Sequence, residues 1–253
     1  MSENAWEKFA KADPYWAVLT DPKYKTGPSG ALSPQERAVF FESGSQFIED
    51  TTQTLKVHFG RRFTQEDCCL DFGSGVGRLI IPMARLCGRA IGIDISDTMR
   101  RICLQNAISE KLGNIECFPT LDHPALQETR FDWVNSYIVF QHLETGLGYR
   151  IFDRLLKQVK PGGVISIHFT AYKDSRVARY LTDHSCYFTV DQNGVRDVFS
   201  DDRYYAPDAM MMNDYDIGRL YMILGQNGFH EVLTRHEDQE GMHGLIFFSV
   251  KTR

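Results

Sequence analysis

Two aspartates and three glycines within one short stretch form the strongest chemical pattern in this sequence. Residues 68–96 read CCLDFGSGVGRLIIPMARLCGRAIGIDIS, with Asp71 and Asp94 each closing an apolar run and glycines at 73, 75 and 77 between them. Glycines admit positive φ and close backbone approach, and a following helix N-terminus favours a carboxylate or phosphate. A carboxylate at the end of a second strand can accept both hydroxyls of a ribose. The stretch predicts a strand, turn, helix and strand that bind a nucleoside with an anionic arm.

The spacing of these residues narrows the choice of nucleoside. A dinucleotide fingerprint requires G-x-G-x-x-G, but Arg78 occupies the sixth position counted from Gly73. Asp71 stands two residues before Gly73, where it would repel a pyrophosphate and attract an ammonium group. A ligand that combines ribose, ammonium and carboxylate groups is S-adenosylmethionine.

The segment Asp71 to Gly77, DFGSGVG, resembles the first motif of the class I S-adenosylmethionine-dependent methyltransferases. The resemblance covers roughly residues 65–250. It implies an α/β fold: a Rossmann-like, doubly wound, mostly parallel sheet of about seven strands with helices on both faces. It also implies S-adenosyl-L-methionine as cofactor and S-adenosyl-L-homocysteine as product. The expected cofactor-binding residues are Asp71 for the ammonium, Asp94 for the ribose, Ile95 for the adenine face, and Gly73, Ser74, Gly75, Arg78, Asp122 and Ser136.

Two of these cofactor contacts have open alternatives. Arg78 stands at the first turn of the predicted helix, where it can reach the methionine carboxylate or a substrate anion, or pack on the surface. Asp122 follows the third strand, where the resembling family often has a carboxylate for the adenine amino group, but it stands about one residue late. The alternative role of Asp122 is to cap the next helical turn.

Periodicity and helix signals predict the remaining elements. Ser33 and Glu36 predict a capping box that starts a helix. Ser43-Gly44-Ser45 predicts a break in that helix, as a helix junction or as a point of close backbone approach to the cofactor. Ser96 predicts the cap of another helix. Further strands are expected at 115–118, 131–138, 164–169, 229–234 and 245–250, the last two closing the sheet with one antiparallel strand, and further helices at 149–160 and 215–227.

Two segments are expected to cover the ligands, an N-terminal lid over the cofactor and an inserted cap over the substrate. Residues 1–64 are expected to form an N-terminal helical lid before the methyltransferase domain at 65–253, with Tyr15 and Trp16 facing the substrate; an aromatic strap on the domain edge is the alternative. Residues 171–213 form an insertion of a length typical of functional segments, and its Asn-Gly pair predicts a hairpin. Met211 and Met212 suit an adaptable apolar wall around a substrate, and a satellite core is the alternative.

Methyl transfer from a sulfonium is an in-line displacement in which the cofactor supplies the electrophile, so the protein mainly positions the reactants. A hydroxyl or ammonium acceptor must also lose a proton, which a nearby base assists. His142 after the fourth strand, His168 near the end of the fifth, and Tyr137 are the candidate catalytic residues. The alternatives are histidines with structural hydrogen bonds and a tyrosine packed on adenine. No metal is expected, because the aspartate pair of catechol-type enzymes is not evident after the fifth strand.

The fourth strand limits the acceptor. The segment Asn135-Ser-Tyr-Ile lacks both prolines of the tetrad that related enzymes use for planar amides and bases. The leading prediction is therefore methyl transfer to an oxygen or nitrogen of a small molecule, such as a sugar, a lipid-linked compound or a secondary metabolite. The alternatives are an NAD-dependent oxidoreductase and a non-catalytic module that binds S-adenosylmethionine.

Composition excludes several other classes. The 253 residues carry a net charge of −5, which argues against a nucleic-acid partner. No apolar run approaches the roughly 20 residues that span a bilayer, and the N-terminus lacks a signal-peptide core. A cytoplasmic protein without a membrane span is expected. The six cysteines form no C-x-x-C pattern, and we expect them to be reduced and mostly buried.

Overall fold

The computed structural model describes residues 3–26, 31–174, 176, 185–191, 194–199 and 209–252. The chain forms two compact units, Trp6–Asn135 and Met1–Ala5 with Ser136–Arg253, which are described in turn. The main sheet has seven strands in the order β3-β2-β1-β4-β5-β10-β9. This order confirms the predicted Rossmann-like, mostly parallel sheet, and the expected division of the chain at residue 64 stays a prediction.

Parallel strands form the centre of the first unit. They are β1 (Cys68–Phe72), β2 (Arg89–Ile93), β3 (Ile115–Phe118) and β4 (Phe131–Ser136). Strand β1 pairs with β2 on one side and with β4 on the other, and β2 pairs with β3. Because β1, β2 and most of β4 are buried along their length, they read as nearly continuous apolar runs.

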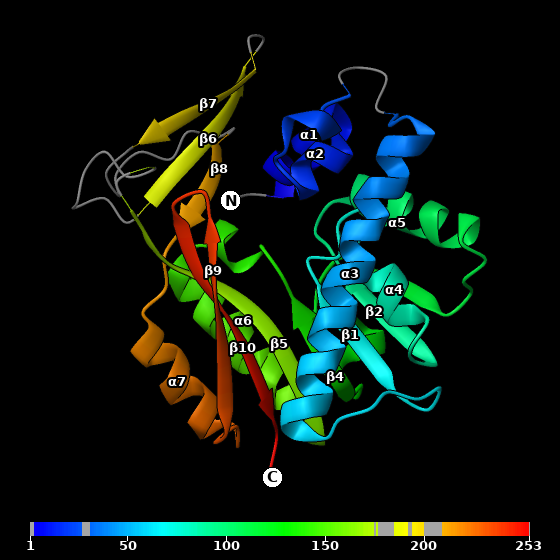
Figure 1. Ribbon diagram of the computed structural model, residues 1–253, viewed down its shortest axis with the longest axis vertical. Coiled ribbons are helices and arrows are strands. Elements are labelled where there is room, and N and C mark those ends of the chain that lie inside the picture. The colour runs from blue at the N-terminus through cyan, green and yellow to red at the C-terminus, as the bar shows by residue number, and fades with distance from the viewer. Residues whose placement is uncertain are drawn as a thin grey trace. The chain divides into compact units, whose positions relative to one another are not determined.

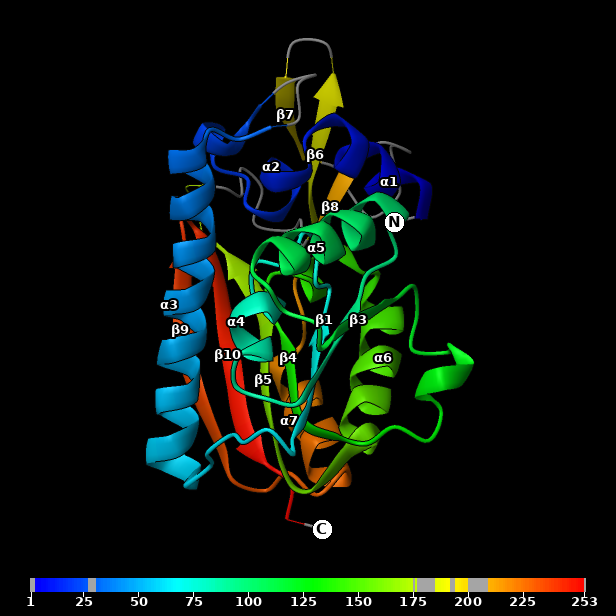
Figure 2. The same ribbon diagram turned by 90° about the vertical axis from the view of Figure 1, so that its right-hand side faces the viewer.

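Helices cover this parallel sheet. The described helices of the unit are α1 (Glu3–Ala12), α2 (Pro14–Val18), η1 (Pro22–Tyr24), α3 (Pro34–Phe59), α4 (Ile80–Ala84), α5 (Asp97–Ser109) and η3 (Pro124–Leu126). Figures 1 and 2 show α3 running alongside α4, which contacts β1 and β2. Ser33 and Glu36 form the predicted capping box, with hydrogen bonds of 3.2 and 2.9 Å. The predicted cap of α5 is also confirmed, since Ser96 Oγ accepts from the Met99 N–H at 3.1 Å.

The predicted break at Gly44 is wrong, because α3 runs unbroken from Pro34 to Phe59. A Cβ on Gly44 would come within 2.1 Å of the Arg78 carbonyl oxygen. The glycine therefore allows α3 to pass close to the backbone that follows the glycine turn, and the helix continues through this point without interruption.

The second unit contains an antiparallel set of strands. Strand β10 (Met242–Val250) pairs with β5 (Val159–Lys173) and with β9 (Val232–Gln239). Strand β5 is longer than predicted, and its residues 164–173 pair with β10. Its described helices are η4 (Phe140–His142), α6 (Thr145–Gln158) and α7 (Ile217–Gln226). Phe140, Phe152, Phe169 and Tyr215 pack their rings together between these elements.

A small three-stranded sheet completes this unit, in the order β7-β6-β8. Its strands are β6 (Ser185–Asp191), β7 (Gly194–Phe199) and β8 (Ala209–Asn213). The pairing of Asp191 with Gly194 confirms the predicted hairpin. The methionine run lies in β8.

Within the described ranges, no helix combines the length and the apolar character needed to cross a bilayer. The five cysteines whose side chains are described are free thiols, as expected; Cys68 and Cys117 are half-buried, and the other three are buried.

Candidate cofactor and acceptor sites

Asp71, near the end of β1, is a buried carboxyl with 2% of its surface exposed. Its Oδ1 accepts a hydrogen bond from Asn135 Nδ2 at 2.9 Å, and the register of β1 and β4 places these two residues side by side. Burial raises the pKa of Asp71 to about 6, opposed by the Asn135 hydrogen bond and the charge of Arg78. A nearby cation would favour the ionised form, so Asp71 is suited to an ammonium group.

Asp94 follows β2 and faces the glycine turn. Its Oδ2 accepts from the Gly75 N–H and its Oδ1 from the Ser96 N–H, each at 2.9 Å. Burial raises the pKa of Asp94 to about 6, against these two backbone hydrogen bonds. Each carboxylate oxygen keeps a second lone pair, so Asp94 can still accept hydrogen bonds from two hydroxyls.

The glycine turn has the backbone geometry that the sequence predicts. Gly73, Gly75 and Gly77 all have positive φ, at 81°, 52° and 98°. Between them, the Ser74 hydroxyl is buried and has no hydrogen-bond partner among the described residues. A buried hydroxyl without a partner is costly, which is consistent with a polar ligand at this turn.

The other expected cofactor residues lie in different surroundings. Arg78 is buried, with 6% of its surface exposed, so the alternative of surface packing is wrong. Ile95 is 37% exposed beside Asp94, open to a ligand. Asp122 is exposed, and its capping alternative is wrong because His123 caps η3, accepting from the Ala125 N–H at 3.3 Å. Ser136 ends β4 and is buried.

The N-terminal helices contact the glycine turn and the start of α5. A Cβ on Gly75 would come within 2.7 Å of Val18 Cγ2, so α2 lies against the turn. Glu7 of α1 accepts hydrogen bonds from the Ser96 and Thr98 hydroxyls, both at 2.6 Å. Burial acts to raise the pKa of Glu7, but these hydrogen bonds outweigh it and hold the pKa at about 2.

Tyr15 and Trp16 are buried in α2. Tyr15 packs edge-on against Phe40, and its hydroxyl lies 3.0 Å from Arg37 Nη1. Trp16 packs at a tilt against Phe9. These contacts fit the aromatic strap, and the substrate role of both residues stays a prediction.

Two thiols lie behind the glycine turn. Cys103 Sγ in α5 is 3.7 Å from Cys117 Sγ in β3. A Cβ on Gly77 would come within 3.0 Å of Cys103 Sγ. Cys103 has no exposed surface, and the contact with Cys117 together with burial raises the pKa of its thiol.

In the second unit, the three candidate catalytic residues lie near one another. His168 on β5 is buried, and its ring centroid is 5.3 Å from that of Tyr137. Burial, followed by the charge of His142, lowers the pKa of His168 to about 3. A Cβ on Gly244 would come within 2.1 Å of His168 Nε2, so this glycine makes room for the ring.

His142 belongs to a buried hydrogen-bonded group. Gln141 Nε2 lies 3.3 Å from His142 Nε2 and 3.5 Å from Met212 Sδ, and Gln141 Oε1 accepts from the Thr170 hydroxyl at 2.9 Å. Met212 is therefore in the same group as the candidate histidine. Of Met211 only the backbone is described, in β8, so its predicted substrate contact lies outside the described side chains.

Several residues beside these groups were missed by the sequence reasoning. Tyr137 donates a hydrogen bond to Glu237 Oε2 at 2.7 Å and accepts one from Gln239 at 3.1 Å. Asn135, which bonds Asp71, is one of them, and its signal in the sequence was a polar side chain within an apolar strand. No motif marks Glu237 or Gln239, which stand about a hundred residues from Tyr137 and meet it only through strand pairing.

Comparisons with known proteins agree with this geometry. The family profile described as Methyltransferase domain matches residues 70–167. The ubiquinone biosynthesis O-methyltransferase of Nitrobacter winogradskyi is 27% identical over 161 residues, which are 63% of this chain. The match spans 57% of that relative's own length.

Solved structures resemble nearly the whole chain. The magnesium protoporphyrin IX methyltransferase of Synechocystis, with bound S-adenosylhomocysteine, has a TM-score of 0.61 at 16% identity, covering 98% of this chain and 99% of that one. The CcbJ methyltransferase of Streptomyces caelestis has a TM-score of 0.60 at 12% identity, covering 99% of both chains. The N-methyltransferase NodS of Bradyrhizobium japonicum has a TM-score of 0.56 at 14% identity, covering 99% and 98%.

At these identities the structural likeness concerns the fold, which is the Rossmann-like methyltransferase fold. Residues 70–167 match a methyltransferase domain, in agreement with the resemblance of the segment Asp71 to Gly77 to the first motif of the class I S-adenosylmethionine-dependent methyltransferases.

Proposed function

We propose that this protein transfers a methyl group from S-adenosylmethionine to an oxygen or nitrogen of a small molecule, such as a sugar, a lipid-linked compound or a secondary metabolite. The pair of carboxylates at the glycine turn carries the proposal. Asp71 and Asp94 both have a pKa raised to about 6 by burial, and a ligand with an ammonium group and a ribose would give each carboxylate a further partner.

The bound cofactor supplies the electrophilic methyl group, and the chain's own residues hold and orient it. Asp71 would hold the ammonium, and Asp94 would accept the ribose hydroxyls with the lone pairs that Gly75 and Ser96 leave. Ile95 would cover adenine. Gly73, Ser74, Arg78, Asp122 and Ser136 are the further proposed cofactor contacts.

The acceptor side of the proposal includes Tyr137, His142 and His168. His168 would act as a neutral hydrogen-bonding ring, because a group with a pKa of about 3 holds a proton poorly at neutral pH. Met212 would contribute an apolar wall beside Gln141. Met211, Tyr15 and Trp16 are the remaining proposed substrate contacts.

Both oxygen and nitrogen acceptors occur among the similar proteins. They include an O-methyltransferase of ubiquinone biosynthesis, an N-methyltransferase and an amino pentose methyltransferase from calicheamicin biosynthesis. This variety supports a small acceptor.

We further propose that residues 1–64 cover the cofactor of a domain at 65–253. The contact of Val18 with Gly75 and the hydrogen bonds of Glu7 support this lid. A cytoplasmic location is also proposed. The net charge of −5 supports the further proposal that no nucleic acid is a partner.

Calorimetry and label transfer test the function. The protein should bind S-adenosylmethionine and not NADH, and Asp94→Ala should weaken donor binding by about 1–3 kcal/mol, the scale of a lost polar contact. Asp97→Ala is the control, because Asp97 is an exposed neighbour outside the proposed cofactor contacts, and it should leave the affinity unchanged. Incubation with methyl-labelled donor and fractionated cell extract should then label one small-molecule fraction. Donor binding without any labelled product would instead indicate a non-catalytic module.

A further inference from the structure

Strand β5 has one polar face inside the second unit. Alternation along the strand places Ile165, Ile167 and Phe169 on one face and Ser166, His168 and Thr170 on the other. Phe169 packs against the rings of Phe140 and Phe152. All six residues are buried, so the polar face needs hydrogen-bond partners that an apolar core does not supply.

Thr170 has such a partner within the described residues, and His168 does not. The Thr170 hydroxyl donates to Gln141, whereas both ring nitrogens of His168 are buried without a hydrogen-bond partner. Because its pKa is about 3, the ring is neutral near pH 7 and carries one donor and one lone pair. A hydroxyl both donates and accepts, while an ammonium only donates and an ionised carboxylate only accepts. The ring of His168 therefore matches a hydroxyl better than either charged group.

Neither histidine of this region is arranged as a base. The low pKa of His168 makes it a weak proton acceptor. The amide nitrogen of Gln141 can only donate, so its contact of 3.3 Å engages the lone pair on His142 Nε2. Gln141 is held in this orientation by the Thr170 hydroxyl. A hydroxyl acceptor would have to release its proton to another group.

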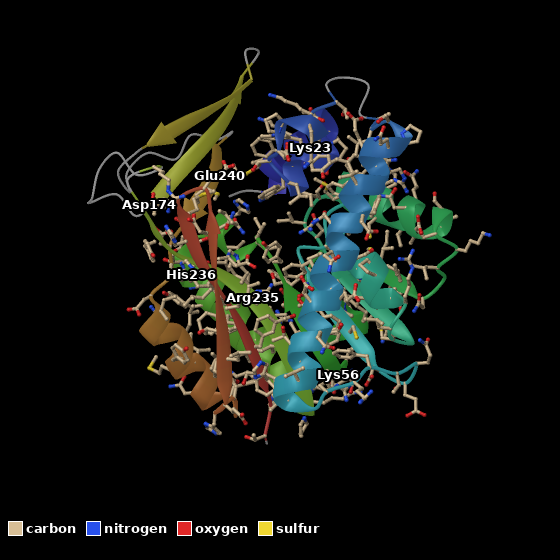
Figure 3. The ribbon with its side chains drawn as sticks, in the orientation of Figure 1. Lys23, Lys56, Asp174, Arg235, His236 and Glu240 are labelled. Atoms are coloured by element: carbon tan, nitrogen blue, oxygen red, sulfur yellow. The ribbon has the colours of Figure 1, made fainter. Side chains whose placement is uncertain are left out.

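Tyr137 and Glu237 provide that group. Tyr137 lies beside His168 and donates its phenolic proton to Glu237 Oε2 at 2.7 Å. Arg235 Nη2 contacts the other oxygen, Oε1, at 3.3 Å. The Glu237 side chain is 19% exposed, so it can exchange protons with water. Figure 3 shows Arg235 and His236 along β9 and Glu240 at its hairpin turn.

The backbone after Tyr137 has an unusual conformation. Ile138 has a φ of 59°, in the left-handed region that β-branched residues rarely adopt. Such a conformation costs on the order of 1–3 kcal/mol, and outliers of this kind cluster at active and binding sites. The strain at the residue that follows Tyr137 is consistent with a tyrosine held in place for function.

From these observations we infer that the acceptor is a hydroxyl that binds at His168 and releases its proton through Tyr137 to Glu237; this inference rests on the proposed function. The acceptor oxygen forms a bond to the methyl carbon while the carbon–sulfur bond of the donor breaks, and its electron pair stays on sulfur. The acceptor's proton passes to Tyr137 Oη as the tyrosine's own proton passes to Glu237 Oε2. The products are a methyl ether, a neutral thioether and a protonated Glu237, which releases its proton to water.

The test uses the full chain and, as acceptor probe, the extract fraction that takes label from the methyl-labelled donor. Three variants are compared with the wild type. Glu237→Gln keeps the size of the side chain and removes its charge, Tyr137→Phe removes the relay, and Glu240→Gln is the control at the exposed end of the same hairpin. Donor affinity is measured for each by calorimetry, and kcat and KM are measured with the acceptor fraction.

We expect kcat of Glu237→Gln and Tyr137→Phe to fall by about 10²-fold or more, the range of acid–base catalysis, with donor affinity unchanged. The labelled product should contain a methoxy group, and Glu240→Gln should behave as wild type.

Failure of the inference differs from failure of the proposed function. A Glu237→Gln variant that retains the wild-type kcat, or a labelled product that is an N-methyl amine, would overturn the inference and leave the methyltransferase proposal standing. No donor binding, or no labelled fraction with wild-type protein, would overturn both. A change in KM alone would assign Glu237 to acceptor binding and also overturn the proton path.

Discussion

The side chain of Val18 in α2 lies against Gly75, the middle glycine of the cofactor turn. A Cβ at Gly75 would come within 2.7 Å of Val18 Cγ2, and Gly75 donates its N–H to Asp94. One small residue therefore joins the N-terminal helices, the turn and the proposed ribose carboxylate.

Substituting Gly75 should separate the cost of its positive φ from the cost of crowding Val18. Gly75→Ala should destabilise the protein by about 1–2 kcal/mol from its positive φ, and further through the contact with Val18. Gly60→Ala is the matched control, because Gly60 has a φ of 66° and no atom within 4 Å of its Cβ position. Thermal unfolding and donor calorimetry should show loss of donor affinity in Gly75→Ala alone, partly restored by adding Val18→Ala. Equal effects of the two glycine substitutions would contradict the role of Val18.

Removing the charge of Asp71 should stabilise the protein without donor and abolish donor binding. The pKa of Asp71 rises from 3.8 to about 6, so between these values the unfolded chain has released a proton that the folded chain retains. Stability therefore falls as pH rises from about 4 to about 6, by roughly 3 kcal/mol at most for this residue. Denaturant unfolding at pH 7 should show Asp71→Asn to be more stable than wild type.

Asp94 provides the contrast to Asp71. Its two oxygens each accept from a backbone N–H group. In Asp94→Asn one of these oxygens becomes an amide NH2, which would face a backbone N–H that it cannot accept from. This variant should gain no stability at pH 7, although burial raises the pKa of Asp94 to the same value of about 6. Stabilisation by both substitutions to the same extent would contradict the assigned hydrogen bonds.

Glu7 should show the opposite dependence on pH. Its hydrogen bonds from Ser96 and Thr98 lower its pKa from 4.5 to about 2 in spite of burial, so its stabilising contribution is complete above pH 4.5 and disappears as pH falls towards 2. Glu7→Gln should cost about 1–3 kcal/mol at pH 7, because it replaces charge-assisted hydrogen bonds. The loss should shrink when unfolding is repeated at pH 3. Glu42→Gln, at an exposed position of α3, should be neutral at both pH values.

A methyl group at Gly244 should displace the ring of His168. A Cβ there would come within 2.1 Å of His168 Nε2, and overpacking of this kind typically costs 1–3 kcal/mol. Gly244→Ala should reduce methyl transfer with donor affinity unchanged. Gly113→Ala, whose Cβ position has nothing within 4 Å, should leave both unaffected. Unaltered transfer in a folded Gly244→Ala protein would count against His168 as an acceptor contact.

Local patterns in the sequence predicted the cofactor half of the protein well. Asp71, the glycines and Asp94 stand within 24 residues, so spacing alone brings them together. The caps at Ser33 and Ser96 were predictable for the same reason, because each involves residues three apart. Arg78 could not be placed from its position in a helical turn, because its burial depends on the approach of Gly44 from another helix.

The acceptor side depends on long-range pairing, which local patterns do not specify. Glu237 reaches Tyr137 only because β9 pairs with β10, and Gly244 accommodates His168 only because β10 pairs with β5 at a bulge. The polar alternation Ser166, His168 and Thr170 was visible in the sequence, but not the partners of these residues. Gly44 was misread as a helix junction because a close helix contact and a break both favour glycine.

The buried thiol of Cys103, in contact with Cys117, can report opening of the structure around the cofactor turn. The Cys103 thiol has no exposed surface and lies against the back of the cofactor turn, so a thiol reagent can reach it only after α5 or the turn has opened. Its labelling rate in native protein therefore measures how often that opening occurs. A ligand that holds the turn closed would slow the labelling, which offers a way to screen for cofactor analogues without knowing the acceptor.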